Sequence, residues 1–385
     1  MSTRELEHAL EVRNRVASTQ TVTRTNGPAA PWIFDAGELR NEKADFFRVA
    51  GFRTPSGVEE ILFEQRETAL VGLLVSRETD HLRVLVNARA EPGLHGSAQF
   101  STTIQSTPSN YERRHGGAAT PFVDEILNPP VGGVVIHDSL QYDWAQYYHA
   151  KTKRFRIVEV PQELPASEPL LWVDLRDLRT LLAEDYLVTG DLRVAASYLE
   201  HHLAPTADAV GDAHGTLATA ELTKVPIESL SRWDVGPDGI MDRDGVRDIV
   251  WVLTRSESRE VSQWLQPLME LSAPVELRLA GRKGESEWEF AIARGTTIGL
   301  DGVDLWFPAE LDQVTRDLAT ISLSAEGGRF FQLAVHASVV EVPHRDDGAR
   351  WVTRQELEAL AATPCATSIE LRLLLSLVQL SGPQP

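Results

Sequence analysis

Two stretches of this chain follow one order of features, and this internal repetition constrains the fold more than any other property of the sequence. The first is QYDWAQYYHAKTKRFRIVEVP at residues 141–161, followed by WVDLRDLRTLL at 172–182. The second is LSAEGGRFFQLAVHASVVEVP at 323–343, followed by WVTRQELEALA at 351–361. Each runs from an extended segment ending in Val-Glu-Val-Pro, through a short loop, to Trp-Val and a helix. This shared order predicts two copies of one fold.

The correspondence continues upstream of these stretches. FEQRETALVGLLVSR at 63–77 and WLQPLMELSAPVELR at 264–278 occupy corresponding places, each ahead of a strand and an Ala-Arg pair. Each copy would then have the roughly 100–150 residues that are typical of a domain. We expect a first module over residues 1–203, a linker rich in Ala, Thr, Asp and Gly over 204–220, and a second module over 221–385.

Local patterns within a copy alternate between strand and helix. Leu82, Val84 and Val86 share one face of an alternating strand, so the polar Asn87 and Arg89 share the other. That second face is too polar for a core, and it begins the segment in which ligand-binding groups are concentrated.

Helix signals follow each Trp-Val pair. Asp174 is placed as an N-cap, and Thr353 with Glu356 makes a capping box in the second copy. The leucines of a buried helical stripe follow Asp174, at Leu175, Leu178, Leu181 and Leu182. The pattern favours the α+β class, with a mixed sheet flanked by helices in each copy. A last helix, at about 368–380, is apolar on most sides and must be covered by the other copy or by a second subunit.

The composition argues against several classes of partner. A formal net charge of -19 disfavours nucleic acid and anionic lipid, so an anionic ligand would be held by a few placed arginines. The single Cys365 leaves no internal disulfide and fits a reducing compartment. The N-terminus is charged where a signal peptide is apolar, and no apolar run approaches the ~18 residues of a membrane span. We therefore expect a cytoplasmic protein that binds neither nucleic acid nor membrane.

Residues 88–117, ARAEPGLHGSAQFSTTIQSTPSNYERRHGG, concentrate recognition groups in one short span. Arginine suits phosphate, and tyrosine and histidine suit proton transfer. These residues are too closely spaced for a solvated helix face and too rich in recognition groups for an ordinary loop. They predict one wall of a ligand site.

Metal and phosphate-loop motifs find little support in the sequence. Residues 242–245, DRDG, resemble part of a calcium loop, but the ligand positions hold Ile240 and Trp251, so a hairpin turn is the better interpretation. His201 and His202 are adjacent and point to different faces of a helix, which argues against zinc. The sequence contains no G-x-G-x-x-G after a strand, no Walker loop and no G-x-S-x-G. We expect no metal site.

One family shares the motifs of the segment 88–117. AEPG at 90–93 and TIQSTPSNYERRHGG at 103–117 resemble the signature of the NDP-hexose 2,3-dehydratases of deoxysugar biosynthesis. SREVSQWLQPLM at 258–269 and the two Trp-Val helices also resemble the family, so the likeness covers nearly the whole chain. The resemblance implies two tandem Nudix-like modules. Neither half contains a Nudix box, so we do not expect pyrophosphate hydrolysis.

The resemblance also implies a reaction. A nucleoside-diphosphate 4-keto-6-deoxyhexose loses the C3 proton, which the C4 ketone acidifies, and then the C2 hydroxyl leaves as water. The elimination needs a base, an acid and an enolate stabiliser, but no cofactor. A downstream ketoreductase and a homodimeric state are further implications. The catalytic candidates are His115, Tyr111 and Glu91, and the substrate-binding candidates are Arg89, Gln105, Ser109, Asn110, Arg113, Arg114 and Gln141.

Departures from the family pattern leave a second hypothesis open. Residues 141–145, QYDWA, stand where the family has Gln-Ser-Glu-x-Gly, so a bulky ring replaces a small residue. The second copy has ARGTTIG at 293–299 where a second EPG motif is expected, although it keeps AEGGR at 325–329. The alternative is therefore a diverged member that is catalytically silent or repurposed, and that binds a nucleotide-sugar-like or other natural-product ligand or acts as a scaffold.

Overall fold

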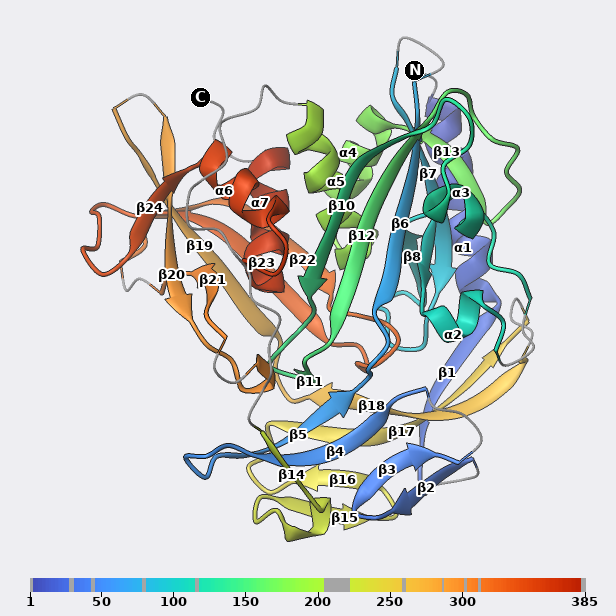
Figure 1. Cartoon of the computed structure of the whole chain (residues 1–385), viewed down its shortest axis with the longest axis vertical. Coiled ribbons are helices and arrows are strands. Elements are labelled where there is room, and N and C mark those ends of the chain that lie inside the picture. The colour runs from blue at the N-terminus through green and yellow to red at the C-terminus, as the bar shows by residue number, and fades with distance from the viewer. Residues whose placement is uncertain are drawn as a thin grey trace.

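The computed structural model describes residues 3–27, 31–42, 46–77, 81–114, 118–203, 222–257, 261–285, 287–300, 303–310 and 313–381. The fold is mixed α+β, and strands predominate in these parts of the chain. This confirms the expected class. Two large sheets stand side by side with helices between them, and two smaller sheets lie beneath (Figure 1).

The two large sheets have the same strand order. In the N-terminal sheet the order is β10 (Val134–Tyr142), β12 (Thr152–Val160), β6 (Ala69–Ser76), β7 (Arg83–Ala90) and β13 (Leu170–Asp174), with β8 (Ala98–Ser101) on β7 and β9 (Ile104–Ser106) on β6. In the C-terminal sheet the order is β22 (Arg316–Ser324), β23 (Ala334–Glu341), β19 (Val275–Lys283), β20 (Trp288–Gly295) and β24 (Arg350–Thr353), with β21 (Leu305–Pro308) on β20. In both, one pair of central strands is parallel, β12 with β6 and β19 with β23, and the edge strand carries a register shift near its start.

The smaller sheets exchange strands between the two halves of the chain. One contains β2 (Trp32–Asp35), β3 (Glu38–Asn41), β4 (Arg48–Arg53), β5 (Glu59–Glu64) and β11 (Tyr148–His149), and the late strand β14 (Thr223–Val225) pairs with β4. The other contains β15 (Trp233–Gly236), β16 (Gly239–Asp242), β17 (Arg247–Ser256) and β18 (Gln263–Leu271), and the early strand β1 (Gln20–Thr25) pairs with β17. Each half therefore completes a sheet of the other.

Helices fill the space beside the large sheets. They are α1 (Thr3–Ser18), α2 (Pro108–Tyr111), α3 (Val123–Leu127), α4 (Leu175–Leu182), α5 (Gly190–Leu203), α6 (Arg354–Ala362) and α7 (Ile369–Ser381), with short 3-10 turns at Ile227–Ser229 and Ile298–Leu300. The last helix, α7, packs against α5 and against strands of the C-terminal sheet. Its cover is thus α5 of the other half together with the sheet of its own half, so its apolar surface does not call for a second subunit. Of the described helices, none is long and apolar enough to cross a membrane.

The expected helix caps and turn are confirmed. The Asp174 carboxylate accepts a hydrogen bond from the Arg176 backbone N–H at 2.8 Å, and Thr353 with Glu356 forms the complete capping box. The four leucines after Asp174 are buried. The carboxylate of Asp242 accepts bonds from three backbone N–H groups in the turn between β16 and β17, which pair as an antiparallel hairpin.

Two reciprocal loop contacts join the halves. At the first crossing, Gly93 donates to the Gly327 carbonyl at 2.8 Å and accepts from the Gln332 N–H at 3.0 Å. At the second crossing, Gly299 donates to the Ala145 carbonyl at 3.0 Å and accepts from the Ala150 N–H at 3.0 Å. The two receiving turns, 327–332 and 145–150, correspond within the sequence repeat, and in each the last residue has a positive φ (52° at Gln332 and 49° at Ala150).

An aromatic contact lies between the two crossings. The ring of Phe63 lies 5.5 Å from that of Tyr148 and 6.1 Å from that of Phe330, measured between centroids. Tyr148 and Phe330 occupy corresponding positions of the repeat, and all three residues belong to the main hydrophobic core. Aromatic groups in this range add to the stabilisation gained by burial. The core is therefore continuous between the halves.

Replacing Gly93 with alanine should destabilise the protein. The added carbon would lie 1.6 Å from the Phe330 carbonyl oxygen, so the first crossing would have to open. Overpacking of this kind typically costs about 1–3 kcal/mol, and we expect the urea unfolding midpoint to fall. Gly236→Ala is the control, because no atom lies within 4 Å of the added carbon. Equal midpoints for the two variants would contradict a structural role for the crossing.

Candidate active site

Buried charges gather at one end of the N-terminal sheet. Strands β7 and β10 end there, β6 and β12 begin there, and α5 starts alongside. The five residues that we call the charged cluster are Asp143, Lys151, Lys153, Asp191 and Glu326. Charged side chains are rarely buried unless they are paired, so such a group marks a candidate site.

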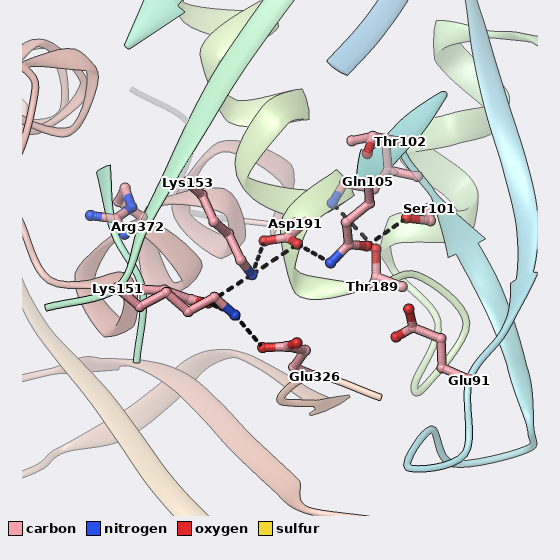
Figure 2. Close-up of polar contacts among 12 residues, drawn as sticks. Glu91, Ser101, Thr102, Gln105, Lys151, Lys153, Thr189, Asp191, Glu326 and Arg372 are labelled. Atoms are coloured by element: carbon pink, nitrogen blue, oxygen red, sulfur yellow. Dashed lines mark hydrogen bonds and ion pairs between the residues drawn. The ribbon is translucent and has the colours of Figure 1, made fainter. Parts of the chain in front are cut away.

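Two lysines hold the cluster together (Figure 2). The Lys153 ammonium lies 3.0 Å from Asp143 and 3.0 Å from both Asp191 oxygens. The Lys151 ammonium lies 3.2 Å from Asp143 and 3.5 Å from Glu326. Both lysines are 4 % exposed, so solvent screens these ion pairs little.

The local pattern explains how Lys153 enters the interior. Alternation in β12 turns Lys153 to the same side as the buried Phe155 and Ile157. Asp191 stands in the first turn of α5, where the helix dipole favours a negative charge. Glu326 comes from the turn that Gly93 contacts at the first crossing, and thus from the second half of the chain.

Proton affinities in the cluster follow from burial and pairing. Burial alone would lower the pKa of Lys153, but Asp143 and Asp191 raise it well above the usual value. Burial raises the pKa of Asp191, and Lys153 opposes that effect. Burial alone would also raise the pKa of Glu326, but Lys151 and Lys153 outweigh it and bring the pKa to about 2. At neutral pH, Lys153 is therefore a cation and Glu326 an anion.

Three residues predicted from the sequence join this cluster. Arg89 donates to the Glu91 carboxylate at 2.7 Å and to the Gln105 carbonyl at 2.7 Å. The Gln105 amide donates to Asp191 at 2.6 Å. Glu91 is 7 % exposed, and Figure 2 shows its carboxylate turned toward the cluster. The first wall of the predicted site is thus continuous with charged residues that the sequence did not single out.

Four other predicted residues lie in α2 and directly after it: Ser109, Asn110, Arg113 and Arg114. The Ser109 hydroxyl donates to Glu67 at 2.5 Å, and Arg114 pairs with Glu112 at 2.6 Å. Asn110, Arg113 and Arg114 are exposed. This group follows directly from β9, which carries Gln105, and Ser109 and Arg114 contact Glu67 and Glu112 rather than the charged cluster.

The remaining predicted residues have separate positions. The half-buried Tyr111 packs against an apolar cluster that includes Ile104 and Ile126, and burial raises the pKa of its hydroxyl. His115 lies outside the described residues. Gln141 is fully buried, and its amide donates to the backbone carbonyls of Ala361 and Thr363, each at 3.2 Å. Those bonds tie β10 to the end of α6, so the structure gives Gln141 a packing role.

A pocket lies beside the second crossing. It contains about 210 Å³ of space free of protein atoms and is lined by Tyr142, Asp143, Ala145, Gln146, Thr297, Leu305, Phe307, Ser368, Ile369 and Glu370. In the register of the repeat, Leu333 and Val335 stand where Lys151 and Lys153 stand in the first half. The pocket is thus lined by both halves of the chain, and the second half lacks the lysine pair.

Metal ligation finds no support in the described parts of the chain. Within them, no group of three or more His, Cys, Asp and Glu side chains is arranged to hold an ion. The carboxylates of the charged cluster are instead paired with ammonium groups.

Comparison with known proteins identifies the family. Residues 3–199 match the sequence model described as NDP-hexose 2,3-dehydratase. The chain belongs to this family. The resemblance inferred from residues 90–93 and 103–117 is thereby confirmed, and the site described above lies largely within the matched region.

Three curated relatives carry the name dTDP-4-dehydro-6-deoxy-alpha-D-glucopyranose 2,3-dehydratase. The protein from Saccharopolyspora spinosa is 27 % identical, over 90 % of this chain and 85 % of its own. The protein from Streptomyces violaceoruber is 26 % identical, over 97 % and 96 %, and that from Amycolatopsis orientalis is 25 % identical, over 92 % and 85 %. The likeness to family members therefore extends over both halves of the chain.

A solved structure titled ADP compounds hydrolase gives a weaker match. It is 14 % identical, with a TM-score of 0.22, and covers 41 % of this chain and 80 % of its own. A TM-score this low supports no conclusion about the fold.

Four residues of the charged cluster could not be singled out from the sequence, for identifiable reasons. Lys151 and Lys153 resemble surface charges in KTKRFR, although Lys153 shares the parity of the buried Phe155. Asp191 resembles an ordinary helix-start acid. Glu326 belongs to the AEGGR motif of the second copy, but no sequence pattern indicates that this motif lies close to residues 88–117. Their proximity arises from contacts distant in sequence.

Replacing Lys153 with methionine should strongly destabilise the fold, because it leaves Asp143 and Asp191 buried without their shared cation. Breaking a buried pair in this way costs about 3–5 kcal/mol. Urea unfolding at pH 7 measures the loss. Lys283→Met is the control, since Lys283 is exposed on β19 and should change the free energy of unfolding by less than about 0.5 kcal/mol.

The deficit of Lys153→Met should shrink on acidification. Burial already raises the pKa of Asp191 above its usual 3.8, and the variant lacks the cation that opposes this. The folded variant therefore takes up a proton at a higher pH than the unfolded chain, and its free energy of unfolding rises as pH falls toward 3.8. A deficit that stays constant between pH 7 and pH 4 would contradict the assignment.

Proposed function

We propose that this chain eliminates water across C2 and C3 of a nucleoside-diphosphate 4-keto-6-deoxyhexose. The observation that carries the proposal is the family match, supported by three relatives named for this reaction over most of the chain. The charged cluster beside Glu91 supplies the groups that such an elimination requires. Their burial strengthens every electrostatic contact with a bound substrate.

Glu91 is our candidate for the base that removes the C3 proton. Its carboxylate faces the charged cluster (Figure 2). Of the other two candidates from the sequence, Tyr111 packs against an apolar cluster and His115 lies outside the described residues. Arg89 orients it through a 2.7 Å hydrogen bond. A positioned carboxylate contributes roughly 10²–10⁴-fold as a general base. His115 and Tyr111 stay candidates for the acid that protonates the departing C2 hydroxyl.

Lys151 is our candidate for stabilising the enolate. Deprotonation at C3 moves negative charge onto the C4 oxygen, and a preorganised ammonium lowers the energy of that state. Lys153 already directs its ammonium at both Asp191 oxygens and at Asp143, each at 3.0 Å. Lys151 has two such contacts, at 3.2 and 3.5 Å, which leave one of its three N–H donors for a substrate oxygen.

The exposed group after β9 suits the polar parts of the substrate. Arg113 or Arg114 would bind the diphosphate, since guanidinium groups match pairs of phosphate oxygens. Ser109 and Asn110 would contact the sugar or the base. On a chain with a net charge of -19, such placed arginines are needed to attract an anionic ligand.

The altered segment at 141–145 does not favour a silent member. Trp144 and Ala145 belong to the second crossing, where Gly299 contacts the chain. The carboxylate of Asp143 remains in the charged cluster beside both lysines. The departures from the family pattern therefore fall at the second crossing and leave these cluster residues in place.

The two halves arose, we infer, by duplication, with modules over residues 1–203 and 221–385. The common strand order, the register shifts in both edge strands and the reciprocal crossings support this. The linker, 204–220, falls outside the described residues. A Nudix-like ancestry of each module remains a prediction from the resemblance.

The chemistry of the product indicates the next step. Loss of the C3 proton and the C2 hydroxyl leaves an enol that becomes a 3,4-diketone, which is reactive and calls for a ketoreductase. We therefore propose that the chain works ahead of such a reductase. A cytoplasmic location and a homodimeric state remain predictions.

Purified protein with dTDP-4-keto-6-deoxyglucose and a coupled ketoreductase should form the 2-deoxygenated product. Glu91→Gln should lower kcat by about 10²–10⁴-fold, because the amide cannot take the C3 proton. Glu184→Gln, an exposed site after α4, should turn over like the parent. Absence of product with the parent protein would refute the proposed function, and a fully active Glu91→Gln would refute the assigned base.

Exchange of the C3 proton with solvent deuterium separates the base from the acid. Glu91→Gln should abolish the exchange, whereas Tyr111→Phe and His115→Gln should keep it within about tenfold of the parent rate even if water loss slows. The half-buried position of Tyr111 against an apolar cluster motivates this expectation. Loss of exchange in Tyr111→Phe or His115→Gln would move the base to that residue.

A further inference from the structure

The second half of the chain contributes a charged side chain to the site in the first half. Glu326 accepts a hydrogen bond from the Tyr148 hydroxyl at 2.7 Å and lies 3.5 Å from the Lys151 ammonium. The same ammonium stands over the Tyr148 ring, 4.1 Å from its centroid. Glu326 thus contacts both polar groups that rise from the turn leading into β12.

The first crossing determines where Glu326 stands. Gly327, the next residue, accepts the hydrogen bond from Gly93. A side-chain carbon at Gly327 would lie 2.5 Å from the Glu91 Cβ, so only glycine lets the two chains approach this closely. Glu91 and Glu326 are therefore held in one fixed relation by the contact between the halves.

The corresponding residue at the second crossing is different. In the register of the repeat, Trp144 stands where the second half has Glu326, and it is buried in the main core. The corresponding turn of the second half leads to Leu333 and Val335, where the first half has Lys151 and Lys153. Of the two crossings, the first is the one that supplies a carboxylate to a lysine-bearing site.

We infer that Glu326 is a positioning residue of the dehydration site, supplied by the second half to hold the Lys151 ammonium against the C4 oxygen of the substrate. This rests on the proposed function and adds to it a requirement for the second half. A carboxylate that pairs with the ammonium on one side restricts its motion, so the cation is placed before the substrate binds. The Tyr148 hydroxyl fixes the carboxylate in turn.

Kinetics of Glu326→Gln test this inference. The amide keeps the shape of the side chain but loses the charge that holds Lys151. We expect kcat to fall on the order of 100-fold, as for a misplaced catalytic group, with KM changed by less than about threefold. Glu358→Gln is the matched control: Glu358 also lies in the second half, is 3 % exposed and has a pKa lowered to about 2. It should keep the parent kcat.

A double-mutant cycle with Lys151→Met separates positioning from a general structural effect. If Glu326 acts through Lys151, the double variant should be no slower than Lys151→Met alone, within about threefold. Glu326→Asp keeps the charge and shortens the side chain, so it provides a second variant. Its kcat should lie between those of the parent and Glu326→Gln.

The outcomes distinguish the two proposals. No product with the parent protein would overturn the proposed function itself. An active parent with parent-like kcat in Glu326→Gln and Glu326→Asp would overturn only the positioning role. Losses that multiply in the double variant would also overturn it, because they would show that Glu326 does not act through Lys151.

Discussion

The arrangement of this protein depends on two glycines that each enter the other half of the chain. Gly93 and Gly299 both donate and accept one backbone hydrogen bond with a turn of the opposite half. Any side chain at either position would overlap a backbone carbonyl oxygen, at 1.6 Å for Gly93 and 2.0 Å for Gly299. These close approaches bring the two sheets together, allow the core to run through both halves and deliver Glu326 to the first-half site.

Burial of charge at the junction is costly, and its retention indicates function. Removing an ion from water is unfavourable unless other charges and hydrogen bonds replace the solvent. The charged cluster meets this condition with alternating signs, from Asp191 through Lys153 and Asp143 to Lys151 and Glu326. Apolar residues of similar size would stabilise a core at least as well. An elimination that develops negative charge on a ketone oxygen gives a chemical reason to keep the ammonium groups buried.

The two halves share a strand order but differ in their chemistry. At corresponding positions, one half holds Lys151 and Lys153 and the other Leu333 and Val335. Glu326 of the second half and Trp144 of the first occupy equivalent places in the crossings, so each half contributes a different kind of residue to its partner. The second half is therefore more than a support for the first: its carboxylate stands within the charged cluster.

The sequence by itself determined the α+β class, the repeat register, the caps at Asp174 and Thr353, the hairpin at 242–245 and the family, because each rests on residues close together in the chain or on a continuous motif. It also indicated Arg89, Glu91 and Gln105, which tertiary contacts bring to the charged cluster. Only the tertiary structure connected them to Lys153, Asp191 and Glu326, because side-chain parity and spacing carry no information about which distant segments meet. The exchange of strands and loops between the halves determines which segments meet, through backbone contacts that no local pattern encodes.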